Sequence, residues 1–157
     1  MLQSLQTTLE PDPDAGLVPD FLEALSALAS SVVLVTCRVD GRPWGMTVTA
    51  FCSVSTEPPT VVVSLGAETT AARAIYGTGR FGVSILGEEQ ERIARHGSRP
   101  GAGKYLEEFV DSPATRGASP VVADAVSHLD CEVAETIRVA DHVLFVGRVR
   151  AARSAKA

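Results

Sequence analysis

The sequence has few of the residues that mark metal sites and disulfide frameworks. Its three cysteines, Cys37, Cys52 and Cys131, have no metal-type spacing, so we expect no metal site. Each lies in an apolar, strand-like stretch, where a free thiol usually behaves as a small buried hydrophobe. A sparse, odd cysteine count suits a reducing compartment, and the first twenty residues lack the basic and apolar regions of a secretory signal. We therefore expect a cytoplasmic protein.

Basic charge is also scarce. The chain has 14 Lys and Arg against 19 Asp and Glu, which gives a formal net charge of −5. A nucleic-acid-binding domain normally carries a basic face, so this balance argues against a nucleic-acid partner. The uncharged runs are too short to cross a bilayer, and no run of like charge suggests a membrane-surface helix. With 157 residues and 45% hydrophobic side chains, the chain can bury the core of one globular domain.

The order of apolar and turn residues predicts a mainly β domain with a few short helices. Residues 1–19, punctuated by proline and acidic residues, are expected to form a flexible arm before a domain over 20–157. Asp20 is a candidate N-cap of an amphipathic helix packed on the sheet. Further helices are expected at 71–76 and 88–95, and strands at 32–39, 44–51, 60–65, 80–86, 126–139 and 142–152. This set predicts a barrel of six or seven strands.

Turn residues indicate where these elements meet. Asp40-Gly41 is a strong signal for a two-residue hairpin. Thr69 and Thr70 are candidate helix caps, and Gly77 and Gly79 are expected to end that helix. Alternation along 126–139 predicts that Leu129 and Cys131 face the core while His128 and Asp130 face solvent. His128 is therefore expected to be a solvated surface histidine.

The stretch from Gly41 to Pro59 combines small hydroxyl and small apolar residues. It has no Asp, Glu, His, Lys or Arg from Pro43 to Thr56, and hence no nucleophile–base pair of its own. Hydroxyls and backbone N–H groups could instead hold a flat, uncharged ligand with polar edges. Composition alone favours the simpler interpretation, a buried strand pair whose threonines suit the pleated backbone.

A glycine-rich loop follows the predicted helix at 88–95. His96 to Lys104 holds three glycines together with His96, Arg99 and Lys104, and could wrap a phosphate through backbone N–H groups and a cationic side chain. A solvated connection explains the same composition equally well. Neither the P-loop nor the dinucleotide-binding glycine motif is present, so a phosphate would be held in another way.

Several fixed spacings in the Gly41–Pro59 region coincide with a known pattern. Asp40-Gly41, Gly45-Met46-Thr47, Ala50-Phe51, Ser53-Val54-Ser55 and Pro58-Pro59 resemble the flavin reductases that partner two-component monooxygenases. That family consists of small homodimers with an FMN-binding split barrel. The resemblance implies that FMN or FAD lies along this segment, contacted by Thr47, Val48, Thr49, Ala50, Ser53, Val54 and Ser55. It also implies that Thr69, Thr70, Arg99 and Lys104 serve the flavin phosphate end, although Ala71 stands where relatives often have a hydroxyl.

A second part of the resemblance lies near the end of the chain. Ala140-Asp141-His142, followed by Gly147-Arg148-Val149, is similar to the family's Gly-Asp-His turn, with alanine in place of glycine. The resemblance implies that Asp141 and His142 lie near the nicotinamide of NADH or NADPH, and that His142 orients the hydride donor as the catalytic residue. The structural alternative is a histidine that only hydrogen-bonds across its turn. A turn that requires a positive φ would also resist alanine.

The activity that the resemblance implies is an NAD(P)H:flavin oxidoreductase that supplies reduced flavin to a separate oxygenase. Hydride transfer between two cofactors needs alignment rather than a catalytic triad, in agreement with the uncharged segment. Two alternatives stay open. The chain could hold a flavin tightly and use it on another substrate, or it could be a non-catalytic flavin- or haem-binding barrel.

Overall fold

The computed structural model describes residues 16–111 and 118–155 of the chain. Seven strands, three α-helices and one short 3₁₀-helix succeed one another in this part. Their bounds, in chain order, are α1 (Leu17–Ser26), β1 (Val33–Val39), β2 (Arg42–Val48), β3 (Phe51–Thr56), β4 (Pro59–Gly66), α2 (Thr70–Thr78), β5 (Arg80–Ile85), η1 (Glu88–Gln90), α3 (Glu91–Ser98), β6 (Ser127–Val139) and β7 (His142–Ser154).

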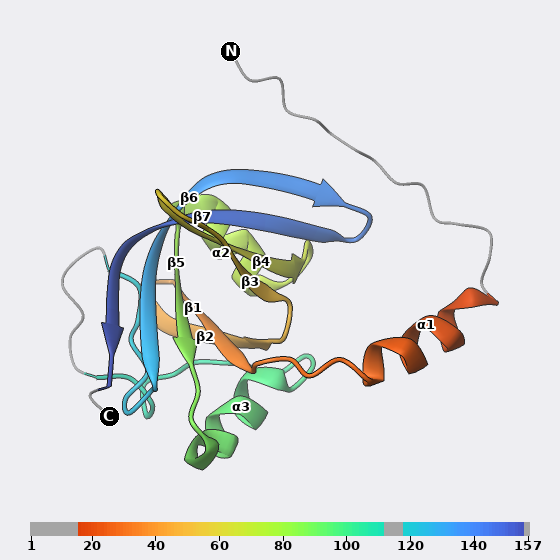
Figure 1. The fold of residues 1–157 in the computed structure, drawn as a ribbon. Helices are drawn as coiled ribbons and strands as arrows, with labels where there is room; N and C mark the ends of the chain where they lie inside the picture. The colour runs from red at the N-terminus through yellow and green to blue at the C-terminus, as the bar shows by residue number, and fades with distance from the viewer. Residues whose placement is uncertain (1–15, 112–117, 156–157) are drawn as a thin grey trace.

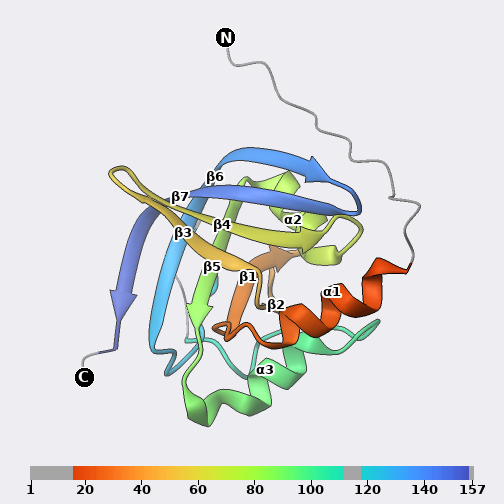
Figure 2. The same cartoon turned by 45° about the vertical axis from the view of Figure 1, so that its right-hand side comes forward.

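The strands form one antiparallel sheet in the order β2-β1-β5-β6-β7-β4-β3. Figures 1 and 2 show this sheet curling round so that the long β6–β7 hairpin lies over one end of it. The predicted mainly β barrel is thereby confirmed. The hairpin at Asp40-Gly41 is also confirmed: both residues have positive φ, at 51° and 76°, as the favoured two-residue turns require.

The two edge strands of this sheet are neighbours in sequence. β2 and β3 are joined only by Thr49 and Ala50, yet they occupy opposite ends of the strand order. Among the described residues no hydrogen-bonded ladder connects them. The free edge of β2 pairs instead with the loop after α3, since Gly45 N–H donates to Lys104 C=O and Leu106 N–H donates to Pro43 C=O. Between β2 and β3 the barrel is therefore closed only by the covalent chain. We call this two-residue link, Thr49-Ala50, the seam.

Two apolar cores lie on the two faces of the sheet. The larger one fills the barrel and packs α2 against it, with Val35, Phe81 and Phe145 fully buried. A smaller one on the outer face joins Leu34, Ile93, Leu106 and Val122. The outer core fixes α3 and the chain on both sides of residues 112–117 to the sheet. The loop that carries Lys104 is thus anchored on a packed surface.

Three expectations about the N-terminal half are wrong. α1 begins at Leu17 after Gly16, so Asp20 lies inside the helix rather than at its cap. None of its residues is buried against the described part of the chain, and Figure 1 shows it standing apart from the sheet. The expected strand over 44–51 is two strands, interrupted at the seam. The first fifteen residues, where most of the expected arm falls, lie outside the described residues.

Helix ends follow the sequence signals more closely in α2. Thr69 caps it, because its Oγ1 accepts a hydrogen bond from the Ala72 N–H at 3.2 Å. Gly79 ends it in the left-handed region at φ 67°, whereas Gly77 lies within the helix. A Cβ at Gly77 would meet nothing within 4 Å, so this glycine is a surface position and not a stop.

The cysteines divide into two kinds. Cys37 and Cys131 are buried, and burial raises the pKa of each thiol to about 12, so both are inert core residues as expected. Cys52, in contrast, is exposed on β3, which corrects the expectation for that residue. No group of three potential metal ligands occurs among residues 16–111 and 118–155. Within the same ranges, no helix has the length and hydrophobicity needed to cross a bilayer.

Candidate functional site

The last residues of β4 bring distant parts of the chain together. Ser64 N–H donates to Ala50 C=O at 3.0 Å, so the seam lies against β4 at that point. Two residues later Gly66 pairs with His142 of β7, and its carbonyl accepts a hydrogen bond from Thr69 Oγ1 at 2.8 Å. Ser64 and Gly66 are about 7 Å apart along an extended strand. The seam, the start of α2 and His142 therefore meet at one end of the sheet.

A hollow of about 360 Å³ opens beside the start of α2. Three of the predicted residues, Thr69, Thr70 and Lys104, line it together. The other lining residues come from β2, from the start of α2 and from the glycine-rich loop: Trp44, Met46, Glu68, Ala71, Gly101, Ala102 and Gly103. Of these, Trp44, Met46 and Glu68 were not predicted to lie at the site. Trp44 and Met46 lie inside the Gly41–Pro59 segment, and the only tryptophan of the chain was a signal that could have found them.

The donors around this hollow suit a phosphate group. The first amides of a helix have no partner within the helix, and the cap satisfies only Ala72, which leaves the N–H groups of Thr70 and Ala71 at the helix end. Lys104 supplies a cation opposite this end, and partial burial lowers its pKa from the ordinary value. The arrangement is therefore able to hold the phosphate end of a nucleotide.

His142 lies at the beginning of β7, half exposed, with its Nδ1 2.8 Å from Asp141 Oδ1. The hydrogen bond to His142 lowers the pKa of the Asp141 carboxyl. Asp141 is itself held by its backbone, since Ala67 N–H donates to Asp141 C=O. Ala140 has φ 50°, so the turn does require the positive φ that glycine would adopt more readily. The alanine is accommodated there, and the imidazole stays accessible.

The other predicted residues have varied surroundings. Thr47 donates its hydroxyl to Ala94 C=O at 2.6 Å, which ties β2 to α3. Val48 is buried, whereas Thr49, Ala50, Ser53 and Val54 are exposed. Ser55 Oγ accepts from the Glu57 N–H in the turn after β3. Arg99, unlike Lys104, does not line the hollow. Its guanidinium contacts His96 Nδ1 at 2.6 Å and faces a second, larger groove.

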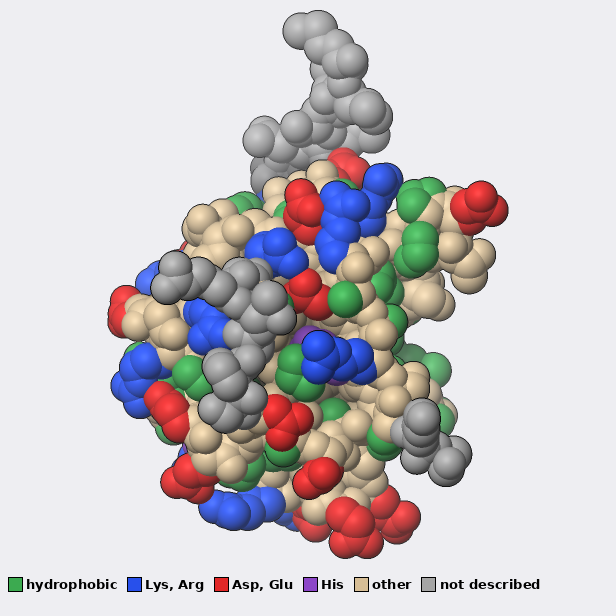
Figure 3. Space-filling model, turned by 90° about the vertical axis from the view of Figure 1, so that its left-hand side faces the viewer, with side chains coloured by type: hydrophobic (Ala, Val, Ile, Leu, Met, Phe, Trp, Pro, Cys, Tyr) green, Lys and Arg blue, Asp and Glu red, His purple; other side chains and the backbone are tan. Residues whose placement is uncertain are grey.

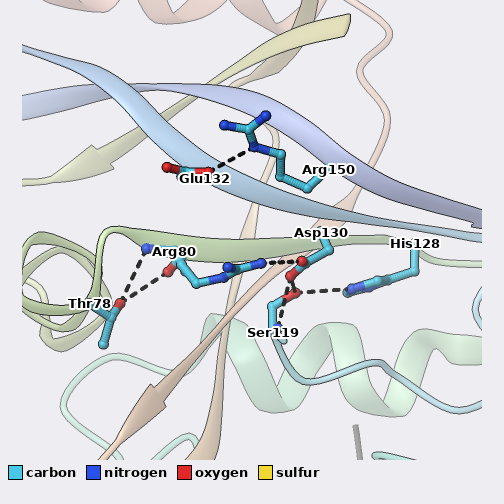
Figure 4. A network of polar contacts seen from close by, with 7 residues as sticks. All are labelled: Thr78, Arg80, Ser119, His128, Asp130, Glu132 and Arg150. Carbon is cyan, nitrogen blue, oxygen red and sulfur yellow. Dashed lines mark hydrogen bonds and ion pairs between the residues drawn. The ribbon is translucent and has the colours of Figure 1, made fainter. Parts of the chain in front are cut away.

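A buried polar cluster on the outer face of the sheet was missed by the sequence analysis. Asp130 accepts hydrogen bonds from Ser119 Oγ at 2.6 Å and from Arg80 at 2.6 Å (Figure 4). His128 lies between the hydroxyls of Ser84 and Ser119. His128 and Asp130 are only 5% and 8% exposed, so the expectation that both face solvent is wrong. Residues 118–122 cover this face of β6, and polar partners make its burial possible.

This cluster has no role in the hollow, but it fixes the covering chain. Thr36 Oγ1 donates to Pro120 C=O at 2.7 Å beside the Ser119–Asp130 bonds. A Cβ at Gly82 would lie 2.3 Å from Thr36 Oγ1, so only glycine leaves room for these groups.

On the side of the molecule that carries the end of β7, acidic and basic side chains are interspersed rather than separated into patches (Figure 3). The candidate site is therefore the hollow beside α2.

Comparisons with known proteins point to one family. The family model for a flavin reductase like domain matches residues 25–157. The NADH-dependent flavin reductase StyB of Pseudomonas fluorescens is 37% identical over 134 residues, which cover 83% of this chain and 75% of that protein. The reductase component of the 4-nitrophenol 4-monooxygenase/4-nitrocatechol 2-monooxygenase of Rhodococcus opacus is 33% identical over 144 residues, covering 92% and 74%.

Solved structures show the same fold. The styrene monooxygenase flavin reductase of Pseudomonas putida S12 superposes with a TM-score of 0.75 at 34% identity, covering 88% of each chain. The NADH:FAD oxidoreductase SgcE6 of Streptomyces globisporus, solved with NAD and FAD fragments, gives a TM-score of 0.80 at 26% identity, covering 94% of this chain and 87% of that one. With the family model spanning nearly all of the described residues, the chain belongs to the flavin reductase like family.

Proposed function

We propose that this protein is an NADH-dependent flavin reductase that supplies reduced flavin to a separate oxygenase component. The observation that carries the proposal is the hollow at the end of β4, where a helix N-terminus and Lys104 face each other in a chain of the flavin reductase like family. Relatives named as reductase components of monooxygenases support the oxygenase partner. The buried, unreactive thiols of Cys37 and Cys131 suit the cytoplasm.

The protein's share of this chemistry is to bind and to orient. When bound, the flavin ring supplies the hydride-accepting centre. The α2 amides and Lys104 would hold its phosphate, and the seam residues would lie along its ring. Of the described side chains that line the hollow, Glu68 and Lys104 are the two that ionise, and Glu68 pairs with Arg73 at 2.7 Å, which leaves the Lys104 ammonium to bind the phosphate. His142 would position the nicotinamide beside the ring.

Steady-state NADH oxidation with and without added free flavin separates the proposal from its alternatives. A reductase that uses diffusible flavin oxidises NADH only when flavin is added, and the rate saturates as the flavin concentration rises. A protein that keeps its flavin would turn over without addition once a second substrate is present. A non-catalytic flavin- or haem-binding barrel would show a bound chromophore and no NADH oxidation. NADPH measured in parallel decides between the two nicotinamide donors.

Bulk at the seam should block flavin binding. We expect Thr49→Trp to raise the flavin dissociation constant about tenfold or more, a loss of about 1.4 kcal/mol, because an indole would occupy the space of the ring. Fluorescence titration of FMN measures the constant, and circular dichroism verifies the fold. Thr56→Trp, an equally exposed threonine at the other end of β3, is the matched control. Normal flavin affinity in Thr49→Trp would show that the seam is only a connection.

Removing the imidazole should affect the nicotinamide selectively. We expect His142→Ala to lower kcat/KM for NADH about tenfold, or about 1.4 kcal/mol of transition-state stabilisation, while flavin affinity changes less than twofold. The half-exposed ring has Asp141 as its hydrogen-bond partner, so little stability should be lost. Equal losses for both ligands with a lower melting temperature would instead assign His142 a structural role.

The exposed apolar helix supports a homodimer with the flavin near the subunit interface. α1 displays Leu17, Phe21, Leu22 and Leu25, each at least 45% exposed, and an obligate interface buries such surface. We expect a dimer in sedimentation velocity at micromolar concentration, and a shift towards monomer for the double variant Leu22→Glu/Leu25→Glu. The same changes at exposed Tyr76 and Val126 serve as the control. A wild-type monomer that still binds flavin tightly would contradict the dimer.

A further inference from the structure

A second groove, of about 1010 Å³, lies beside α3. Four arginines line it, Arg42, Arg92, Arg95 and Arg99, together with the rings of Tyr105 and Phe109. The carboxylates in the lining are Glu107 and Glu108, and Arg95 pairs with Glu91 beside it, so four positive and three negative side chains leave this surface with a charge of +1. The whole chain carries −5. We call this surface the arginine groove, and its sign favours an anionic ligand.

Two of the four arginines of this groove lie over aromatic rings. The Arg42 guanidinium lies 3.7 Å from the centroid of the Tyr105 ring, and that of Arg92 lies 5.1 Å from Phe109. Their carboxylate partners are exposed, at 47% for Glu107 and 75% for Glu108. Exposed ion pairs contribute little stability, so an anion can replace them at small cost. Planar guanidinium groups suit both the oxygens of a diphosphate and the face of a base.

The arginine groove adjoins the hollow of the candidate site. Tyr105 lines the groove, and Lys104, directly before it, lines the hollow. On β2, Arg42 lines the groove and Trp44 lines the hollow. The two residues are two positions apart, so they lie on the same face of the strand. The Trp44 and Tyr105 rings pack edge to face with centroids 4.9 Å apart and form the boundary. A ligand bound in the hollow by its phosphate can therefore extend past this pair.

We propose that the arginine groove binds the adenosine-monophosphate half of a dinucleotide substrate, whose diphosphate spans from the hollow into the groove. This inference rests on the proposed function, because it adds a subsite next to the flavin hollow. Two dinucleotides offer the same chemistry, FAD and NADH, whereas FMN and reduced nicotinamide mononucleotide lack the adenosine half. The guanidinium groups hold the diphosphate, and the adenine stacks against the arginine–aromatic pairs. The groove thereby selects dinucleotides over mononucleotides.

The test compares each dinucleotide with its mononucleotide. In the full-length protein, Arg92→Gln/Arg95→Gln removes two charges from the exposed surface of α3 and breaks only exposed ion pairs. We expect the FAD dissociation constant to rise about tenfold and the FMN constant to change less than twofold if FAD is the occupant. If NADH is the occupant, its KM rises relative to that of reduced nicotinamide mononucleotide. Arg150→Gln, which breaks the exposed pair with Glu132, is the control.

Titration of wild type and variant with ADP alone separates this inference from the proposed function. ADP that binds wild type and loses about tenfold in affinity for the variant supports the subsite, even if the protein proves unable to reduce flavin. An active reductase whose FAD-to-FMN and NADH-to-mononucleotide ratios are the same in the variant, with ADP binding unchanged, overturns it.

Discussion

Asp130→Ala should lower the free energy of unfolding by about 3 kcal/mol, as expected when one partner of a buried ion pair is removed. Burial disfavours the ionised Asp130, but hydrogen bonds from Ser119 and Arg80 outweigh it, so the net effect is a lowered pKa for this carboxyl. Without it, the Ser119 N–H and hydroxyl lose their acceptor under the covering chain. Arg80 is partly exposed and can recover some hydration, which places the loss at the lower end of the range for buried pairs.

Glu132→Ala provides a matched comparison on the same strand. Glu132 also pairs with an arginine, Arg150, at 2.8 Å, but both side chains are about half exposed, so we expect a change within about 0.5 kcal/mol. Figure 4 shows the two pairs side by side. Urea unfolding at pH 7 measures both variants. Equal losses would mean that burial does not distinguish the pairs, contrary to our interpretation of the outer face.

The free energy of unfolding should fall by about 3 kcal/mol between pH 6.5 and pH 4 because of one residue, His128. Burial lowers its pKa from 6.5 to about 4, an effect that the nearby Asp130 charge opposes and Arg153 reinforces. The unfolded chain then binds a proton near pH 6.5 while the folded chain does not. The stabilising contribution of the neutral imidazole is therefore complete above pH 6.5 and is lost as the pH falls towards 4.

His128→Gln should remove most of this pH dependence. Glutamine can bridge the Ser84 and Ser119 hydroxyls without titrating, so the difference between wild type and variant should shrink steadily from pH 7 to pH 4.5. Carboxylates elsewhere affect both proteins alike in this comparison. Parallel stability curves over that range would show that His128 is hydrated in solution and would overturn the buried assignment.

Local signals in the sequence predicted most of the fold. Asp40-Gly41 specifies a turn by its own φ preferences, and Thr69 caps α2 through a hydroxyl three residues from its partner, so both depend only on neighbours along the chain. The family resemblance supplied what such signals cannot, namely that Thr69, Thr70 and Lys104 lie together. Their common hollow depends on strand pairing across the whole domain.

The failures have a shared physical origin. Alternation along β6 marks two faces but does not reveal that residues 118–122 cover the polar one, so His128 and Asp130 were assigned to solvent. The apolar stripe of α1 predicted packing on the sheet, whereas none of its residues is buried there. Arg99 and Lys104 are close in sequence, yet the Trp44–Tyr105 pair and the chain direction place them in different depressions. Each error concerns a contact set by distant residues.

The seam has a consequence for ligand entry. A barrel whose strands are hydrogen-bonded to one another all the way round can widen only by breaking one of its strand pairings. Each broken hydrogen bond then exposes two polar backbone groups. Here the rim between β2 and β3 is a single covalent link, while the β2 edge is already occupied by Lys104 and Leu106. Torsional changes at Thr49 and Ala50 would part the rim at the cost of the Ser64–Ala50 hydrogen bond, while the strand ladders stay paired. A planar ligand that entered at this rim would therefore require no unfolding of the barrel strands.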